Sequence, residues 1–432
     1  MVIYVLLLII SFLLNLIDAF RTNVKFLNMF YGIAFIDIYL GVLIFKFFFG
    51  RNLDPELVNT LSLTLLCFIV FLSHSVRKTK LTKRNIARVM SPDLLRQNII
   101  FFSTASVVLM VLFFAKNGVP LLAEIVEKAR TDAFLNDKLL YYVFLVFNPL
   151  LIIYTYLFCG KRYFKFFLCI SFLLGLLTGF RSLLFLLLVV SVILYFGERK
   201  PFSKSYLAWI VTAALMLFLV LQAMTYVRMP EDNRNFQLSA LQLIDRIFLV
   251  NVRNLSDIKS YFDVHPKLCG LTIIWDFAFV RRLLNTLGWL QQREAFAIWM
   301  TYRLNPNASS SFIMTPTIFG IAIANFGIVG PPLACMLALS VGQASKVFKQ
   351  KKLLKPLYYY FALLALPIFT RGLFTTLALF AVPALMLSYT IALIYSMQKA
   401  VFSPLSVPRP TVASNKDICS FCHKLDNKMS QS

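Results

Sequence analysis

The chain has 432 residues, 59% of them hydrophobic, and a mean hydropathy of +0.76, values that exclude an ordinary soluble domain. Its formal net charge of +24 would suit a nucleic-acid-binding protein, but the basic residues are spread over short loops between apolar runs, which excludes that class of function. Apolar runs of about 20 residues, enough to cross the hydrocarbon core of a bilayer, recur from the first residue onward. The sequence therefore predicts an all-α polytopic membrane protein.

About eleven transmembrane helices are predicted. The first apolar run has no basic segment before it and no small-residue cleavage site after it, so we interpret it as a span and not as a signal peptide. The predicted spans cover residues 2–20, 26–49, 57–76, 97–115, 139–158, 166–180, 182–197, 206–226, 328–345, 357–370 and 373–396. They divide the chain into an N-terminal membrane bundle of about eight spans (1–226), a large loop (227–311), C-terminal membrane segments with about three spans (312–397) and a disordered tail (398–432).

The loops on the two sides of the membrane differ in charge. One set, which includes the tail, holds 25 basic and 4 acidic residues, whereas the other set, which includes the large loop, holds 17 basic and 13 acidic residues. Loops rich in lysine and arginine stay in the cytoplasm. We therefore expect the N-terminus and the large loop to lie outside and the C-terminus to lie in the cytoplasm.

Residues 312–326 are apolar enough to insert into a membrane. If they crossed it, the lysine-rich stretch at 346–355 would move outside, against the charge rule. We therefore predict a re-entrant segment here, since Pro316 is compatible with a break that neighbouring helices cover.

Two arginines lie at the ends of apolar runs that are too short to cross upright. Arg181 follows 15 residues that begin at Phe166, and Arg371 follows 14 residues that begin at Leu357. Fifteen helical residues cover only about 22 Å, and an arginine inside a membrane is expensive and usually functional. The alternative is an interfacial arginine that extends its side chain to the surface. We expect both to lie near the outer surface, where they would bind an anion under the large loop.

The large loop carries ten basic and seven acidic residues with aromatic side chains between them, which indicates a folded segment. Arg246 and Arg253 are seven residues apart in a helical pattern and would share one helix face, with Asp257 one turn beyond Arg253. Arg281 follows an aromatic run. Each of these arginines suits either an anionic substrate or a solvated structural role.

The candidate general bases are His265 and Asp276, with Asp257 and Glu294 as further possibilities. The ordinary pKa of histidine, about 6.5, suits proton abstraction, although His265 also suits a plain turn before Pro266. Since there is no Asp-x-Asp motif and no phosphate-binding glycine motif, we predict neither a metal nor a cofactor. We interpret the Cys-x-x-Cys-His sequence of the tail, at residues 419–423, as part of a solvated tail without a bound cofactor.

The order of three features resembles Wzy-type polymerases of O-antigen and enterobacterial common antigen. These features are GFRSLLFLLLVV at 179–190, the loop with RNLSDIKSYF at 253–262, and SSSFIMTPTIFGIAIANFGIVG at 309–330 followed by TRGLFTT at 370–376. The resemblance covers roughly residues 100–395 and implies a metal-independent membrane glycosyltransferase with a GT-C-like helical bundle. It also implies the bacterial inner membrane as the location, so that the N-terminus and the large loop would lie in the periplasm. It implies that the substrate is an oligosaccharide linked to undecaprenyl diphosphate. The diphosphate would be held by Arg181, Arg371 and loop arginines such as Arg253. A regulator of polysaccharide chain length is a possible partner. Some relatives carry a histidine before the TPT segment, where this chain has Asn305, Asn307 and three serines.

Two alternatives follow from the same features. An O-antigen ligase or a related lipid-linked glycan transferase would have nearly the same architecture. A flippase for lipid-linked oligosaccharides would belong to the transporters, which favour repeated halves with a binding site at the midplane. No repeat is evident here, so the polymerase is the leading interpretation.

Overall fold

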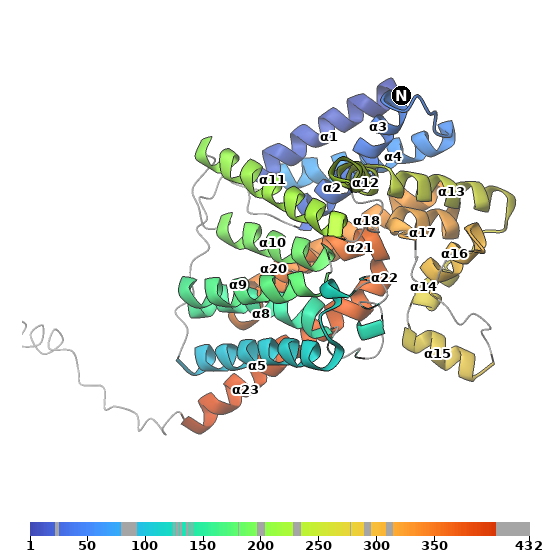
Figure 1. Ribbon diagram of the computed structural model, residues 1–432. Coiled ribbons are helices and arrows are strands. Elements are labelled where there is room, and N and C mark those ends of the chain that lie inside the picture. Colours follow the sequence, from blue (N-terminus) through green and yellow to red (C-terminus); the bar gives the residue numbers. More distant parts are fainter. Residues whose placement is uncertain are drawn as a thin grey trace, which may run out of the picture.

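The computed structural model describes residues 1–21, 26–78, 93–123, 126, 129, 132–134, 137, 140, 142–179, 181–196, 204–227, 235–276, 278–288, 295–307 and 314–402. Within these ranges the chain is helical throughout, apart from short connections and turns, and contains no strand. Many of the helices run side by side in one bundle, and a group of shorter helices covers one end of it (Figure 1). The predicted all-helical fold is therefore confirmed for the described part of the chain.

The first half of the chain supplies most of the bundle. Its helices are α1 (Val2–Arg21), α2 (Phe26–Ala34), the π-helical η1 (Phe35–Leu40), α3 (Gly41–Phe47), α4 (Pro55–Lys78), α5 (Asp93–Asn117), η2 (Pro120–Leu122), η3 (Val143–Phe147), α8 (Asn148–Tyr154), η4 (Thr155–Cys159), α9 (Lys161–Leu177), α10 (Arg181–Phe196) and α11 (Lys204–Val227). We call the next group the helical cap: α12 (Phe236–Phe248), α13 (Val250–Val264), α14 (Leu271–Asp276), α15 (Ala278–Thr286) and α16 (Phe296–Leu304).

The chain then returns to the bundle and completes it. The last helices are α17 (Thr317–Phe326), η6 (Gly327–Val329), α18 (Gly330–Ala344), α19 (Lys346–Gln350), η7 (Lys352–Leu354), α20 (Lys355–Leu363), α21 (Ala365–Arg371), α22 (Leu373–Thr376), η8 (Leu377–Ala381) and α23 (Val382–Phe402). Helix α23 continues past residue 397, where we expected the tail to begin, and the rest of the tail lies outside the described residues.

Each predicted span coincides with a helix, but the helices differ in length. Six of those in the described ranges are long and apolar enough to cross a membrane, or seven if the pair Lys352–Leu363 and Ala365–Arg371, bent by 41°, is one span. The apolar helix Val143–Cys159 and helices α9 and α10 have 17, 17 and 16 residues. The described part of the chain thus contains several helices that are long and apolar enough to cross a membrane, and the number eleven stays a prediction.

Side-chain contacts show which helix ends lie together. At one end of the bundle, Asn98 near the start of α5 bonds Gln398 near the end of α23 (2.6 Å), and Cys159 at the end of η4 bonds the carbonyl of Arg96 (3.8 Å). The Tyr154 hydroxyl donates to the carbonyl of Leu353 (3.1 Å), which places the start of α20 near the same end. The helices that begin or end here therefore have their other ends at the opposite end of the bundle.

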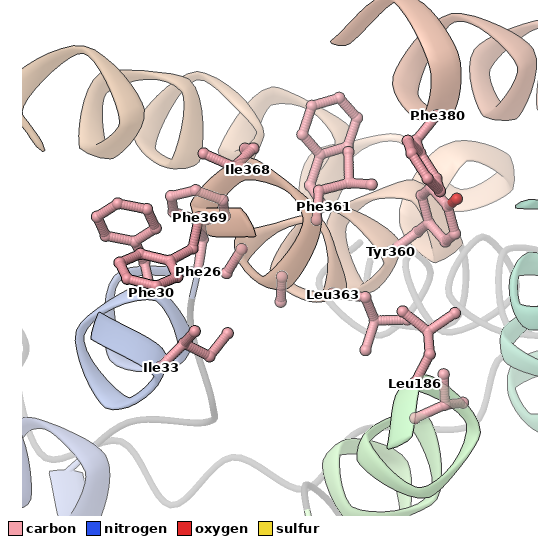
Figure 2. Packing of buried hydrophobic residues seen from close by; sticks show 14 of the residues in the cluster. Phe26, Phe30, Ile33, Leu186, Tyr360, Phe361, Leu363, Ile368, Phe369 and Phe380 are labelled. Carbon is pink, nitrogen blue, oxygen red and sulfur yellow. The ribbon is translucent and has the colours of Figure 1, made fainter. Parts of the chain in front are cut away.

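The centre of the bundle is the bent pair α20 and α21. Residues 357–365 are all buried, whichever way their side chains point, so this helix is surrounded by protein. Figure 2 shows Phe30 and Ile33 of α2 on one side of the pair and Leu186 of α10 on another. Phe369 meets Phe319 of α17 edge to face, with ring centroids 5.7 Å apart.

Helices α17 and α18 turn sharply against each other. Gly327 has a φ of +62°, which glycine adopts without strain, and a Cβ added at Gly330 would overlap the carbonyl oxygen of Ala322. In a straight helix these two residues would be about 12 Å apart, so the chain folds back at Gly327. Although Thr317–Gln350 is long enough to cross a membrane, it does not run straight. The ten residues of α17 alone cover about 15 Å, which favours the predicted re-entrant path.

This close contact makes Gly330 sensitive to substitution. We expect Gly330→Ala to lower the stability of the protein by about 1–3 kcal/mol, because the added methyl group overlaps backbone that cannot move aside. Gly32→Ala in α2 is the matched control, since nothing lies within 4 Å of its added Cβ, and it should be neutral or slightly stabilising. Thermal unfolding of both purified variants measures the difference. Equal melting temperatures would contradict the fold-back.

Candidate functional site

The helical cap is joined to the bundle mainly through α13. Three apolar side chains on one face of this helix, Val252, Leu255 and Phe262, are buried against the bundle and the rest of the cap. Lys259 lies at the helical spacing of the same stripe and is also buried, with its side chain 6% exposed. A lysine in this position must have anionic partners, because an unpaired buried charge is very costly.

Three carboxylates surround the Lys259 ammonium. Nζ lies 2.7 Å from an oxygen of Asp263 on α13 and 2.8 Å from Glu56 on α4, and it also pairs with Asp54 just before α4. Asp54 in turn accepts the backbone N–H of Glu56 (3.0 Å) near the start of α4. We call these four residues the Lys259 cluster. It connects the cap to a bundle helix about 200 residues earlier in the chain.

The cluster changes the ionisation of its members. Burial lowers the pKa of Lys259, but the hydrogen bonds to Asp263, Asp54 and Glu56 outweigh burial and hold that pKa above its ordinary value. The hydrogen bond from Lys259 holds the pKa of Asp54 below its usual value. Lys259 and Asp54 are therefore both charged at neutral pH.

The same carboxylates are the one group of acidic side chains in the described ranges whose oxygens lie close enough to hold a metal ion. The Lys259 ammonium already occupies the space between them, so a divalent cation would have to displace a buried amine with three partners. A cavity of about 10 Å³ next to Lys259, lined in part by Thr60 and Lys267, has room for about one water molecule. The cluster is thus built as a structural connection and not as a substrate pocket.

A second set of contacts holds the segment that leads into α17. Asn254 donates to the carbonyl of Thr315 (3.1 Å), and the Thr315 hydroxyl donates to the side chain of Asn251 (2.9 Å). The backbone N–H of Met314 donates to the Thr301 hydroxyl of α16 (3.0 Å). The cap therefore fixes the start of α17 from two helices.

Thr317, the first residue of α17, has a φ of +55°, which is strained for a β-branched residue. It is fully buried, and its hydroxyl accepts the N–H of Gly320 (3.3 Å). Such strain persists only where the surroundings determine the backbone, and it is concentrated at functional sites. The TPT segment is therefore held firmly between the cap and the bundle.

Arg371 lies at the capped end of the bundle. Helix α21 ends at Arg371 and Gly372 (φ +92°) turns the chain into α22, on which α14 of the cap packs. The Arg371 side chain is half-buried, and its guanidinium lies over the ring of Phe380, 5.3 Å from the centroid.

Arg181 lies at the same end of the bundle. Helix α9 starts at the end where Cys159 meets Arg96, so its 17 residues carry the chain to the capped end, where Gly179 (φ +70°) turns it into α10. Arg181 is the first residue of α10, and its side chain lies outside the described part of the chain. Arg181 thus follows a turn at Gly179 and Arg371 precedes a turn at Gly372, both at the capped end of the bundle.

The two arginines of the cap do not share a helix face. The pattern predicted one continuous helix, but α12 ends at Phe248 and α13 begins at Val250, with the buried Leu249 at the joint. Arg253 pairs across this joint with Asp245, its charge also acts on Asp257, and Arg246 is exposed. The physical reason for the break is packing, because α12 lies against η1 while α13 lies against α17.

The remaining predicted site residues are spread over the cap. Arg281 of α15 donates to the carbonyl of Trp275 (2.6 Å), where it caps the end of α14. Asp276 is the last residue of α14, and its side chain lies outside the described part. His265 is exposed and stacks on Tyr261 with ring centroids 4.0 Å apart, and its Nδ1 lies 2.8 Å from the Tyr261 carbonyl. Among the described side chains, His265, Arg253, Arg281 and Arg371 contact four different residues, Tyr261, Asp245, Trp275 and Phe380.

Lys259 was not predicted as a site residue, because it was counted among the ten basic residues of the large loop and was not placed on a helix face. Its position at 259, seven residues after Val252 and four after Leu255, was the available signal. No sequence pattern identified Asp54 and Glu56 as its partners.

The chain matches no protein-family model, no curated protein and no solved structure. Its function must therefore be argued from its own residues.

Proposed function

We propose that this protein polymerises oligosaccharide repeat units linked to undecaprenyl diphosphate into a surface polysaccharide such as O-antigen. The observation that supports the proposal most is the position of Arg181 and Arg371. Each lies at a turn between apolar helices, at the capped end of the bundle. A lipid diphosphate presents its charge at that depth, just below the membrane surface, and arginine can bind two phosphate oxygens at once.

The proposed reaction is a glycosyl transfer without a metal. A hydroxyl oxygen of one lipid-linked repeat unit forms a bond to the anomeric carbon of the growing glycan on another carrier. The bond between that carbon and the phosphate oxygen breaks, and the electron pair leaves with the lipid diphosphate. Fixed guanidinium groups stabilise the departing negative charge. The hydroxyl proton passes to a base, for which His265 and Asp276 remain the candidates, or to the departing diphosphate.

The proposal includes a topology and a fold type. The capped end faces the periplasm of the inner membrane, about eleven spans form a bundle of the GT-C type, and the tail is cytoplasmic. The charge difference between the loops supports this orientation. A regulator of polysaccharide chain length is the proposed protein partner, and the cap is the part that would meet it.

The polysaccharide ladder of a deletion strain tests the function. Loss of the ladder with retention of a single repeat unit on the lipid core is expected, because capping with one unit needs a ligase and a flippase but no polymerase. Loss of every repeat unit would contradict polymerisation and point to one of those two alternatives.

A further inference from the structure

Helix α12 is the first helix of the cap. Both of its ends contact bundle helices, at points several residues before those bundle helices end. At its start, buried Gln222 of α11 donates to the carbonyl of Phe236 (3.2 Å), and Gln222 lies five residues before α11 ends. At its other end, a Cβ added at Gly41 of α3 would overlap the carbonyl oxygen of Phe248, and Gly41 lies six residues before α3 ends. These offsets place the two ends of α12 about 7 and 9 Å below the helix ends.

The end of α3 marks the boundary of the apolar layer on this side. Phe47, Phe48 and Phe49 are all more than half exposed, and the polar residues Arg51 and Asn52 follow directly. Exposed aromatic residues next to polar chain are typical of the membrane interface. An element that contacts Gly41 therefore lies inside the apolar layer.

The direction of α12 agrees with the equal depth of its two ends. In Figure 1, α12 is seen almost along its axis, whereas α1, α5, α10 and α11 run across the view. Helix α12 thus runs across the direction of these bundle helices and not along it. A helix perpendicular to membrane-crossing helices lies in the plane of the membrane.

The surface of α12 has three sides. Ser239 and Leu243 are buried against the protein. Leu238, Leu241 and Ile244 recur every three residues and are exposed, Leu241 to 62%. Gln242 and Arg246, one turn apart, are also exposed and form a third, polar side. A helix between protein, lipid and water needs such a division.

We infer that α12 is an in-plane membrane helix whose side formed by Leu238, Leu241 and Ile244 contacts the hydrocarbon of the bilayer. Its depth matches that of interfacial helices, which bury their apolar side about 5–10 Å into the boundary of headgroups and acyl chains. Gln237 and Asp245 also lie on this side, and the pairing of Asp245 with Arg253 neutralises the charge of Asp245. The part of the chain between the last N-terminal span and the other helices of the cap is thus not a simple loop.

Lipid is the occupant that the surroundings favour. Helix α11 ends beside α12 and exposes Leu215, Met216 and Leu219, and α1 exposes a similar row of apolar side chains. The helix on which α12 packs therefore exposes apolar side chains of the same kind as the apolar side of α12. A second copy of the chain could cover it only by excluding lipid from this edge.

Spin labels at Leu241 and Ile244 test the inference in full-length protein whose natural cysteines are replaced, reconstituted in phosphatidylcholine–phosphatidylglycerol vesicles. Relaxation by oxygen, which concentrates in lipid, and by a water-soluble nickel chelate is measured at each site. Both labels should resemble a label at Leu112 on α5, which is 54% exposed. A label at Val264, which is 79% exposed at the end of α13, is the matched control in water and should show the opposite ratio.

Two outcomes would overturn the inference. Access of the nickel chelate to Leu241 comparable with Val264 would place α12 in water, and protection from both reagents would place it against a second copy. A Leu241→Trp variant gives an independent measurement if spin labels unfold the protein. Brominated acyl chains should quench its additional fluorescence several-fold more strongly than acrylamide does, and the reverse would reject the membrane position.

Discussion

Arg371→Lys is expected to lose most polymerising activity, about 10²-fold in rate, while the protein still accumulates in the membrane. Lysine keeps the positive charge, but it offers a single ammonium on a flexible stem and cannot bind two phosphate oxygens in a fixed plane. The stacking of the guanidinium on Phe380 would also be lost. Glycan length on gels and turnover with purified lipid-linked repeat units measure the effect. Arg181→Lys and Arg181→Ala should behave in the same way.

Arg51→Lys is the matched control for this result. Arg51 is also an arginine over a phenylalanine, 6.0 Å from the ring centroid of Phe45, but it is exposed and follows the apolar run. Its substitution should leave the glycan ladder unchanged. If Arg181 and Arg371 hold one diphosphate, the double substitution should cost less than the sum of the single ones. A full-length ladder from Arg371→Lys would remove Arg371 from the proposed site.

Lys259→Met is expected to lower the stability of the protein by about 1–3 kcal/mol and to loosen the cap. Methionine preserves the apolar part of the side chain, so the loss comes from the three charge-assisted hydrogen bonds. The expected loss is smaller than for a fully buried ion pair, because the three carboxylates are 40–53% exposed and stay hydrated when the ammonium is removed. Thermal unfolding and protease sensitivity of the cap measure it. Lys267→Met is the control, since Lys267 is 34% exposed and 4.0 Å from Asp263.

The dependence of this stabilisation on pH has a definite sign. The pKa of Asp54 is lowered in the folded protein, so its contribution is present above its ordinary pKa of about 4 and is lost as the pH falls through the lowered value. The pKa of Lys259 is raised, so its contribution is complete below an ordinary value of about 10.4 and is lost only as the pH rises through the raised one. The difference between wild type and Lys259→Met should therefore be constant from about pH 5 to pH 10. A difference no larger than that of Lys267→Met would contradict the cluster.

The apolar runs predicted where helices lie, because every membrane helix must satisfy its backbone hydrogen bonds internally and needs about 20 apolar residues. The turns at Gly179 and Gly372 were also visible, since each glycine lies within two residues of an arginine between two apolar runs. The break at Leu249 was not visible in the sequence, because the helical pattern continues through this residue. Only the packing of α12 and α13 on two different helices interrupts the helix. The partners of Lys259 were hidden for a similar reason, since a contact between residues 54 and 259 has no local pattern.

The bent pair α20 and α21 gives the protein an independence from the thickness of its membrane. Residues 357–365 touch protein on every side, whereas α1, α5 and α23 expose apolar side chains such as Leu13, Val111 and Met386 to lipid. A thicker or thinner bilayer acts on the outer helices, which can tilt at a cost of fractions of a kcal/mol per Å. The interlocked aromatic contacts of Phe369 with Phe30 and Phe319 set the height of α21 instead. We therefore expect Arg371 to keep its distance from the cap in bilayers of different acyl chain length.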